Sequence, residues 1–293
     1  MQKLPFSQVD VFTRHGYRGN PVAVILRAGD LSSRQMQAIA NWTNLSETPF
    51  VIPATDPQAD YQLRIFTPHA EIPFAGHPTI GTAHALLEAG MVKLHTGKLV
   101  QQCAAGLVTL HVKPDAQGEQ WIAFELPEPT ITGLDPARQQ SLQASLGCSL
   151  KPGVMPLRVD VGPRWLVAQL ADASAVLALR PDLQQMQALD RASGDTGVVV
   201  FGEYPAGSRS QIEVRAFAPA VGVNEDPVCG SGNGCVAAYI RETGQVDTIG
   251  NQYVATQGQL MGRDGMLQLS IAPDRIEVGG NAVTCINGSL MCE

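Results

Sequence analysis

Short apolar runs typical of β-strands alternate along the chain with a smaller number of helical patterns. In the first half these runs fall at residues 9–12, 21–26, 48–52, 61–66, 99–103, 107–112 and 121–125. Runs of this length, bounded by Gly, Pro, Asn and Asp, are typical of strands joined by turns. The pattern therefore predicts that strands make up most of this half.

Two helical patterns interrupt the strand-like runs of the first half. The first follows the N-cap candidates Ser32 and Ser33, places apolar residues on one face and ends near Asn44. The second has Pro78 as a first-turn proline, continues through residues 79–89 and is followed by Gly90. Because almost every residue of the second pattern is apolar or small, we expect a buried central helix.

A phrase of the first half returns in the second half after a three-residue insertion. The matched residues are Arg64 with Arg215, Phe66 with Phe217, Pro68 with Pro219, Glu71 with Glu225, Pro73 with Pro227, Gly76 with Gly230 and Ala83 with Ala237. Two copies about 150 residues apart indicate a duplicated half. The order of elements repeats as well, with a helix near 181–190, a second central helix at 231–243 and last strands at 266–271, 276–278 and 282–286.

The length of the chain leads to the same division as the repeat. A chain of 293 residues is long for a single core, so two domains are expected. We place an N-terminal half-domain at residues 1–128 and a C-terminal half-domain at residues 129–293, with the last strand allowed to return to the first domain. The expected boundary is the segment 128–136, which is rich in Pro, Gly and Asp.

The charge and composition of the chain argue against several classes of binding partner. The net charge is -7 and no basic run occurs, so we expect no nucleic-acid partner. The first thirty residues contain no apolar run longer than 22–26, which predicts a cytoplasmic protein without a membrane partner. The six cysteines lack CxxC spacing, which favours reduced thiols over a disulfide framework or a zinc site.

Two helix starts that contain glycine are the strongest candidates for a ligand site. They are Gly76-His77 and Gly230-Ser231. Glycine lets a ligand approach the backbone, and the first N–H groups of a helix have no internal partner and favour an anion. If the halves pack about a pseudo-twofold axis, both starts face one cleft between the domains. The plainer alternative is close helix packing, but the matched copies weigh against it.

Cofactor motifs find little support. Residues 230–234 resemble a dinucleotide fingerprint only weakly, because Cys235 takes its final position, and no Gly-Lys-Ser/Thr sequence of a P-loop occurs. Pyridoxal phosphate needs a lysine, and neither helix start contains one. We therefore expect a reaction without a cofactor or metal.

Few residues in these segments can move protons. Glu47 precedes an apolar strand, where partial burial raises a pKa toward neutrality, as a general acid/base requires. Taken singly, an exposed Glu47, a helix-capping Asp226 and a structural His77 are the plainer interpretations. Cys229 lies at a helix start, where a thiolate is stabilised, but its matched position is Ala75. The functional interpretation therefore depends on the whole set.

Several phrases resemble the PhzF-like phenazine biosynthesis family, and the resemblance runs essentially from end to end. They are Arg-Gly-Asn-Pro at 18–21, Leu-Ser-Glu-Thr at 45–48, Glu-Ile-Pro-Phe-Ala-Gly-His-Pro at 71–78, Glu-Asp-Pro-Val-Cys-Gly-Ser at 225–231 and Val-Gly-Gly-Asn-Ala-Val at 278–283. The resemblance implies an α+β fold of the diaminopimelate epimerase type. That fold has two pseudo-symmetric domains, each a curved, mostly antiparallel sheet wrapped around a central helix.

The resemblance also implies roles for particular residues. In the founding member, an isomerase of trans-2,3-dihydro-3-hydroxyanthranilate, a glutamate moves a proton between carbons without a cofactor. That glutamate corresponds to Glu47, and the supporting polar residues correspond to His77, Asp226 and Ser231. Substrate binding is implied for Asn20, Gly76, Cys229 and Gly230, and a homodimer is the assembly common in the family. The related epimerases use two cysteines, and Ala75 stands in place of the first.

The sequence thus predicts a cofactor-independent isomerase that moves a proton on a small carboxylate-bearing substrate, with Glu47 as general acid/base in the cleft between the domains. One alternative is an epimerase or racemase of an amino or imino acid that uses Cys229. A second alternative is a small-carboxylate binding protein without catalysis.

Overall fold

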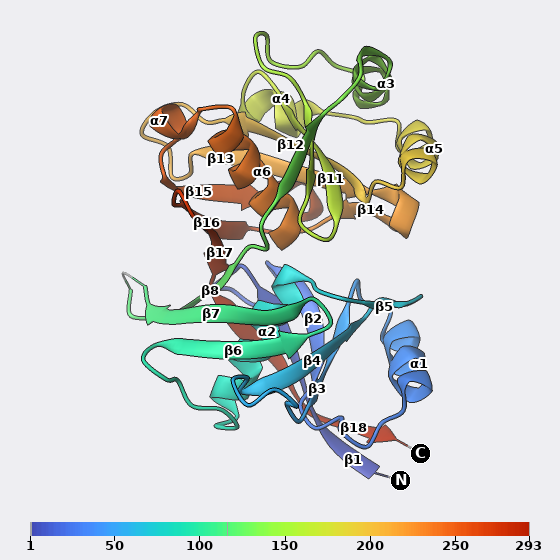
Figure 1. Cartoon of the computed structure of the whole chain (residues 1–293), viewed down its shortest axis with the longest axis vertical. Coiled ribbons are helices and arrows are strands. Elements are labelled where there is room, and N and C mark those ends of the chain that lie inside the picture. Colours follow the sequence, from blue (N-terminus) through green and yellow to red (C-terminus); the bar gives the residue numbers. More distant parts are fainter. Residues whose placement is uncertain (1, 116, 293) are drawn as a thin grey trace. The chain divides into compact units, whose positions relative to one another are not determined.

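The computed structural model describes residues 2–115 and 117–292. The chain forms two compact units: unit 1 comprises Met1–Glu125 and Gly279–Glu293, and unit 2 comprises Leu126–Val278. Strand β17 (Ile276–Gly280) carries the chain from unit 2 back into unit 1. The fold is α+β, as the resemblance implied, and each unit combines strands of a mostly antiparallel sheet with a central helix (Figure 1).

Unit 1 is built from both ends of the chain. Strand β1 pairs antiparallel with β2 on one side and with β18 on the other, and β3 runs parallel to β2. The elements of unit 1 are β1 (Gln2–Val11), β2 (Asn20–Ile25), α1 (Ser33–Thr43), β3 (Thr48–Ile52), β4 (Tyr61–Phe66), β5 (Glu71–Ile72), α2 (Gly76–Glu88), β6 (Lys98–Cys103), β7 (Gly106–Pro114), β8 (Gln120–Glu125) and β18 (Ala282–Cys292).

Helix α2 is the buried central helix of unit 1, as predicted. It packs against β1, β2, β3 and β8, and a Cβ atom on its Gly81 would lie 2.5 Å from Val22 Cγ1. The helix begins at Gly76 after an extended Ala75, so Pro78 lies in its first turn, as predicted. Pro78 is tolerated there because the N–H groups of the first helical turn have no internal partner.

Helix α1 begins and ends where the sequence predicts. Ser32 caps it through a capping box in which Ser32 Oγ accepts from Gln35 N and Gln35 Oε1 accepts from Ser32 N. Asn44 closes the helix in the left-handed region, at φ 53°. The chain then turns directly toward β3, and this turn contains Glu47.

Unit 2 repeats the arrangement with additional helices. A core cluster that includes Leu142, Val176, Met186 and Phe217 lies between its sheet and helices α3, α4 and α5. The elements of unit 2 are β9 (Thr130–Gly133), α3 (Pro136–Leu146), β10 (Leu157–Asp160), β11 (Arg164–Gln169), α4 (Ala173–Ala178), α5 (Leu183–Ser193), β12 (Gly197–Glu203), β13 (Ile212–Ala218), η1 (Pro219–Val221), β14 (Val223–Asp226), α6 (Gly230–Glu242), α7 (Val246–Ile249), β15 (Gln252–Gln257), η2 (Gln259–Met261), β16 (Gly265–Ile271) and β17.

The second central helix, α6, was predicted to within a residue at each end. Helices α3 and α4 were not predicted, and the last strand is six residues longer than expected because β18 continues to Cys292 along β1. Helix α5 is shifted toward the C-terminus from its predicted position near 181–190, because Asp182 caps it through a bond from Gln185 N.

The matched arginines form the same ion pair in each unit. Arg64 Nε lies 2.7 Å from Glu71 Oε1, and Arg215 Nε lies 2.9 Å from Glu225 Oε1; both pairs are bidentate. Each guanidinium also lies over the phenylalanine two residues further on. The repeated Arg-x-Phe phrase therefore has a structural role, which is to fix the segment that leads to each central helix.

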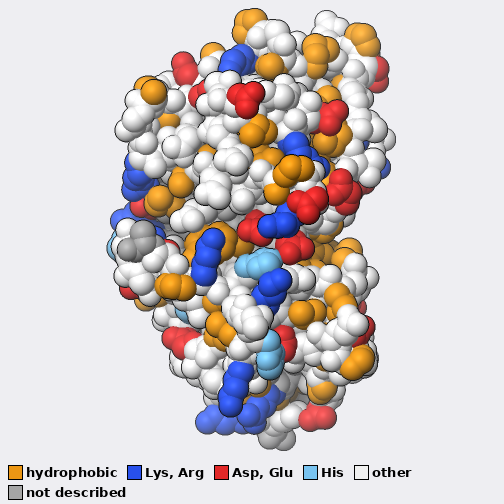
Figure 2. Space-filling view, turned by 60° about the vertical axis from the view of Figure 1, so that its left-hand side comes forward, with side chains coloured by type: hydrophobic (Ala, Val, Ile, Leu, Met, Phe, Trp, Pro, Cys, Tyr) orange, Lys and Arg blue, Asp and Glu red, His pale blue; other side chains and the backbone are white. Residues whose placement is uncertain are grey.

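Surface charge and helix length add two further findings. On the face drawn in Figure 2, acidic side chains lie among the basic ones. Within the described part of the chain, the longest helices have only 13 residues, and none combines the length and apolarity needed to span a membrane. The expectations about nucleic acid and about a homodimer stay predictions.

Candidate active site

Glu47 lies in the turn between α1 and β3, directly before a buried stretch of strand. Its side chain is 18% exposed. Burial raises the pKa of the Glu47 carboxyl to about 6, and a hydrogen bond from Ser46 opposes this rise only in part. Among the described residues, no hydrogen-bond donor reaches Glu47 Oε2. The carboxyl group is thus poised to change protonation near neutral pH.

His77 is the second residue of α2, and the structure brings it to Glu47. Its side chain is 5% exposed, and its Nε2 lies 3.5 Å from Glu47 Oε2. The two residues are thirty positions apart in sequence and meet because α2 packs against β3. Unit 1 therefore holds a buried carboxyl and an imidazole side by side, which is the pairing that acid/base chemistry uses.

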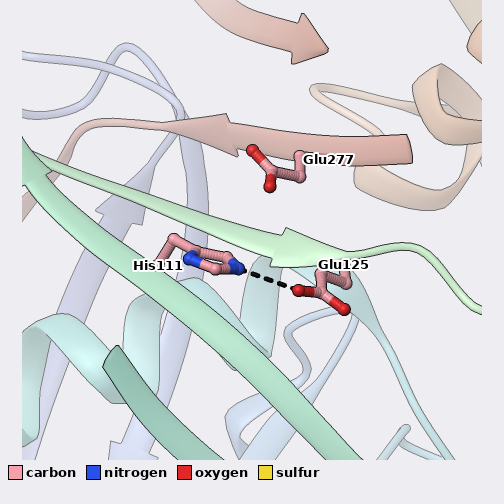
Figure 3. Close-up of side chains that lie close together, drawn as sticks. All are labelled: His111, Glu125 and Glu277. Atoms are coloured by element: carbon pink, nitrogen blue, oxygen red, sulfur yellow. Dashed lines mark hydrogen bonds and ion pairs between the residues drawn. The ribbon is translucent and has the colours of Figure 1, made fainter. Parts of the chain in front are cut away.

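A second histidine–glutamate pair in unit 1 shows what an ordinary contact of this kind looks like. His111 on β7 and Glu125 on β8 lie 2.8 Å apart, Nε2 to Oε1, and their side chains are 25% and 39% exposed (Figure 3). Water reaches both of these side chains, whereas those of Glu47 and His77 are 18% and 5% exposed. Burial distinguishes the two pairs.

Two further residues of unit 1 were predicted to bind substrate. Asn20 opens β2, where it is buried opposite Val11 of β1, and Gly76 is the first residue of α2. Ala75, which precedes the helix, makes no side-chain cap to it. The first N–H groups of a helix have no intrahelical partner, which is the arrangement that an anion-binding turn uses. Binding roles for Asn20 and Gly76 stay predictions.

The predicted residues of unit 2 form one continuous turn and helix start. Asp226 ends β14, and its Oδ1 accepts a hydrogen bond from Val228 N at 3.0 Å. Cys229 is the N-cap of α6, and Gly230 and Ser231 are the first two helical residues. Cys229 Sγ accepts from Gly232 N at 3.2 Å. This leaves the N–H groups of Gly230 and Ser231 as the donors without an intrahelical partner.

The expectation that Cys229 carries a stabilised thiolate is wrong. Burial, followed by the negative charge of Asp226, raises the pKa of the Cys229 thiol well above its usual value. Cys229 is 3% exposed, and the hydrogen bond from Gly232 N is too weak an influence to reverse this rise. Sequence reasoning counted only the helix dipole, which acts on a thiol at the surface, whereas desolvation dominates at a buried one.

One residue of this region was missed at the sequence level. Trp165 on β11 donates from Nε1 to Ser231 Oγ at 3.1 Å. Ser231 Oγ also lies 3.6 Å from Cys229 Sγ, so its hydroxyl is held between an indole and a thiol. No motif signals this contact, because the two residues are 66 positions apart and the fold of the sheet brings them together.

A comparison with protein families decides the membership of the chain. The profile of the family described as "Phenazine biosynthesis-like protein" (PhzC-PhzF) matches residues 9–288. The chain belongs to the PhzF family. It is 41% identical over 98% of its length to "Antisense-enhancing sequence 1" of Schizosaccharomyces pombe, and covers 99% of that protein.

Other relatives of this PhzF-family chain bear on its activity and fold. It is 34% identical to trans-2,3-dihydro-3-hydroxyanthranilate isomerase of Pseudomonas chlororaphis, over 97% of the chain and 98% of that enzyme. A PhzF-family structure from Bacillus anthracis superimposes with a TM-score of 0.85 at 22% identity and full coverage of both chains. The family membership makes the chain an isomerase, and the solved structure establishes the fold.

Proposed function

We propose that this isomerase moves a proton between two positions of a small carboxylate-bearing substrate, with Glu47 as general acid/base and without a cofactor. The observation that carries the proposal is the buried Glu47 carboxyl, whose pKa is raised to about 6 beside His77. A base with this pKa is ionised at neutral pH and still returns the proton readily. The related enzyme from Pseudomonas chlororaphis, named for trans-2,3-dihydro-3-hydroxyanthranilate, supports this class of substrate.

In this proposal each unit supplies its own part of the chemistry. Glu47 takes a proton from one carbon and returns it to another, so atoms and charge balance within the substrate. His77, 3.5 Å away, orients the carboxyl and the polar groups of the substrate. The N–H groups of Gly230 and Ser231 hold the substrate carboxylate at the start of α6, and Asp226 orients its other polar groups. Asn20, Gly76 and Cys229 complete the binding surface.

The alternative epimerase, which uses Cys229 as a base, is less well supported by the geometry. A thiol with a pKa raised well above its usual value yields little thiolate at neutral pH. The matched position in unit 1 is Ala75, so a second thiol is not available there. The non-catalytic alternative gives no reason for burying the Glu47 carboxyl next to an imidazole.

The test measures proton movement directly. Wild-type protein is incubated in D₂O with trans-2,3-dihydro-3-hydroxyanthranilate and with a panel of small amino and hydroxy carboxylates, and deuterium incorporation is followed by NMR. Glu47→Gln removes the base, and we expect turnover to fall by about 10²-fold or more. Glu125→Gln, in the exposed pair with His111, is the matched control and retains wild-type turnover. The wild-type kcat/KM falls as pH drops below about 6, because Glu47 becomes protonated.

Three outcomes contradict the proposal. Wild-type turnover in Glu47→Gln removes the assigned role of this residue. Exchange at an α-carbon that Cys229→Ala abolishes and Glu47→Gln leaves intact establishes the epimerase instead. Saturable binding of carboxylates with no exchange in any of them establishes the binding protein.

A further inference from the structure

The turn that leads into α6 packs against the end of the β15–β16 hairpin. No sequence motif predicted this contact. Gln257, the last residue of β15, pairs with Gly265, the first residue of β16. The Gln257 amide is buried and points at the turn: its Nε2 donates to Asp226 O at 2.8 Å, and its Oε1 accepts from Cys229 N at 3.1 Å. One side chain therefore holds both ends of the segment 226–229.

Two glycines of the same hairpin contact the middle of that segment. A Cβ atom on Gly258 would lie 2.4 Å from Pro227 O, and one on Gly265 would lie 2.5 Å from Val228 Cγ2. At these distances no side chain fits between the hairpin and the turn. Residues 257, 258 and 265 together contact all four residues of the segment, and we name these three residues the hairpin seat.

The hairpin seat also reaches the first turn of the helix. Asn233, a fully buried residue of α6, donates from Nδ2 both to Cys229 O at 2.9 Å and to Gln257 Oε1 at 2.8 Å. The two amides thus connect the strand, the turn and the helix through hydrogen bonds. The position of Asp226 relative to Ser231 is set through Gln257.

The corresponding hairpin of unit 1 is built differently. There Cys103 ends β6 and pairs with Gly106, which begins β7. Cys103 Sγ donates to Gly106 O within its own hairpin, and a Cβ atom on Gly106 would meet nothing within 4 Å. The connection after β15 is longer than the one after β6, and it contributes Gly258 to the hairpin seat.

We propose that Gln257 is a positioning residue of the isomerase, and that the hairpin seat fixes the turn and helix start that bind the substrate. The inference rests on the proposed function, which gives Asp226, Gly230 and Ser231 contact with the substrate. Gln257 itself is buried behind the turn and acts through the Asp226 carbonyl and the Cys229 N–H. A shift of about 1 Å in such a turn is enough to reduce catalysis by about 10²-fold.

Two matched pairs of variants test the proposal. Gln257→Met removes the amide, and its control is Gln169→Met, another buried amide of unit 2, which bonds to Glu203. Gly258→Ala pushes against Pro227, and its control is Gly262→Ala, since both glycines have positive φ but a Cβ atom on Gly262 meets nothing within 4 Å. Urea unfolding gives the free energy of unfolding of each variant. A variant is then compared with its control only where the two have lost a similar amount of stability.

Two readouts follow the turn in the folded protein. One is the rate at which iodoacetamide alkylates Cys229, located by peptide mass spectrometry; the other is kcat and KM with trans-2,3-dihydro-3-hydroxyanthranilate. We expect Gln257→Met and Gly258→Ala to raise the alkylation rate about 10-fold and to lower kcat/KM by about 10-fold or more. The first variant loses two hydrogen bonds to the backbone of the turn, and the added methyl group of the second displaces Pro227. Both controls stay within about 2-fold of the wild type by the same reasoning.

The two readouts separate the possible failures. An unchanged alkylation rate in a folded Gln257→Met variant overturns the hairpin seat. Faster alkylation with unchanged kcat and KM overturns the positioning role, although the contact exists. If the wild type turns over no substrate in the panel, the proposed function fails, and the alkylation rates still decide whether the hairpin seat holds the turn.

Discussion

Glu47 and Asp195 occupy the same kind of connection in the two units, and their environments are opposite. Each follows a helix, α1 or α5, and precedes a strand that runs parallel to its neighbour. Asp195 is buried, yet Arg158 bonds to both of its oxygens, at 2.8 and 3.1 Å. Burial alone would raise the pKa of Asp195, but the bonds from Arg158 and Ser193 hold it below its usual value.

Glu47 has no such partner. Within the described residues, its ion-pair contact is with His77, and burial raises its pKa. The two bonds from Arg158 fix Asp195 in its charged form, in which it contributes to structure. Glu47 has no arginine beside it among the described residues, and its raised pKa lets it take up and release a proton near neutral pH. Of the two acids compared, Glu47 is the one whose environment suits proton transfer.

The largest expected effect comes from breaking the ion pair of Asp195. Asp195→Asn removes the carboxylate that pairs with Arg158 and leaves Arg138 with its contact to Asp190, so we expect a loss of about 3 kcal/mol in the free energy of unfolding. Urea unfolding at pH 7 measures it. The control is Asp264→Asn, in the exposed pair with Arg209, where no measurable change is expected. Equal losses in both variants would mean that the ion pair of Asp195 contributes no more to stability than an exposed one.

A smaller effect of opposite sign is expected at Glu47. Its folded-state pKa of about 6 lies above the ordinary value of 4.5, so its stability contribution is present at low pH and is lost as pH rises through 6. Glu47→Gln is then more stable than the wild type at pH 8 by about 2 kcal/mol, and not at pH 4. Urea unfolding at both pH values checks this. A difference that does not change with pH would mean that the carboxyl is not desolvated.

The smallest expected effects come from removing the N-caps of the helices that precede Glu47 and Asp195. We expect the loss of stability to be similar in the two units. Ser32 caps α1 and Asp182 caps α5, each through a hydrogen bond from the residue three positions later. Ser32→Ala and Asp182→Ala should each cost about 1 kcal/mol in the free energy of unfolding. Thermal or urea unfolding of both variants gives the comparison. If one cap costs much more than the other, the two connections are not equivalent.

Much of the fold could be predicted from local sequence. Three features were predicted in this way: the duplicated Arg-x-Phe phrase, the cap at Ser32 and the small-residue helix α6. The signal for each of them lies within a short stretch of sequence. Helix α3 was missed because its own start signals, Asp135 as N-cap and Pro136 in the first turn, lie in a segment interpreted as a linker. Composition suggested a boundary where the residues in fact begin a helix.

Some residues of the candidate site could be identified from the sequence and others could not. Glu47, His77 and the turn before α6 were identified from short motifs, and their functional roles stay predictions. Trp165 and Gln257 could not be identified, because each contacts the helix start across a strand, 66 and 28 positions away. The pKa of Cys229 was misjudged for a related reason: burial depends on tertiary packing, which no local motif reports.

The antiparallel pairing of β1 with β18 joins residues from opposite ends of the sequence, from Gln2 with Cys292 to Val11 with Ala282. On the ribosome, residues 126–278 emerge as an uninterrupted stretch and can complete unit 2 early. Unit 1 must wait for its last strand, and contacts over such sequence separations form slowly. The half that contains Glu47 is therefore the last to be assembled during synthesis, so a truncated chain exposes the open side of β1 before it can acquire activity.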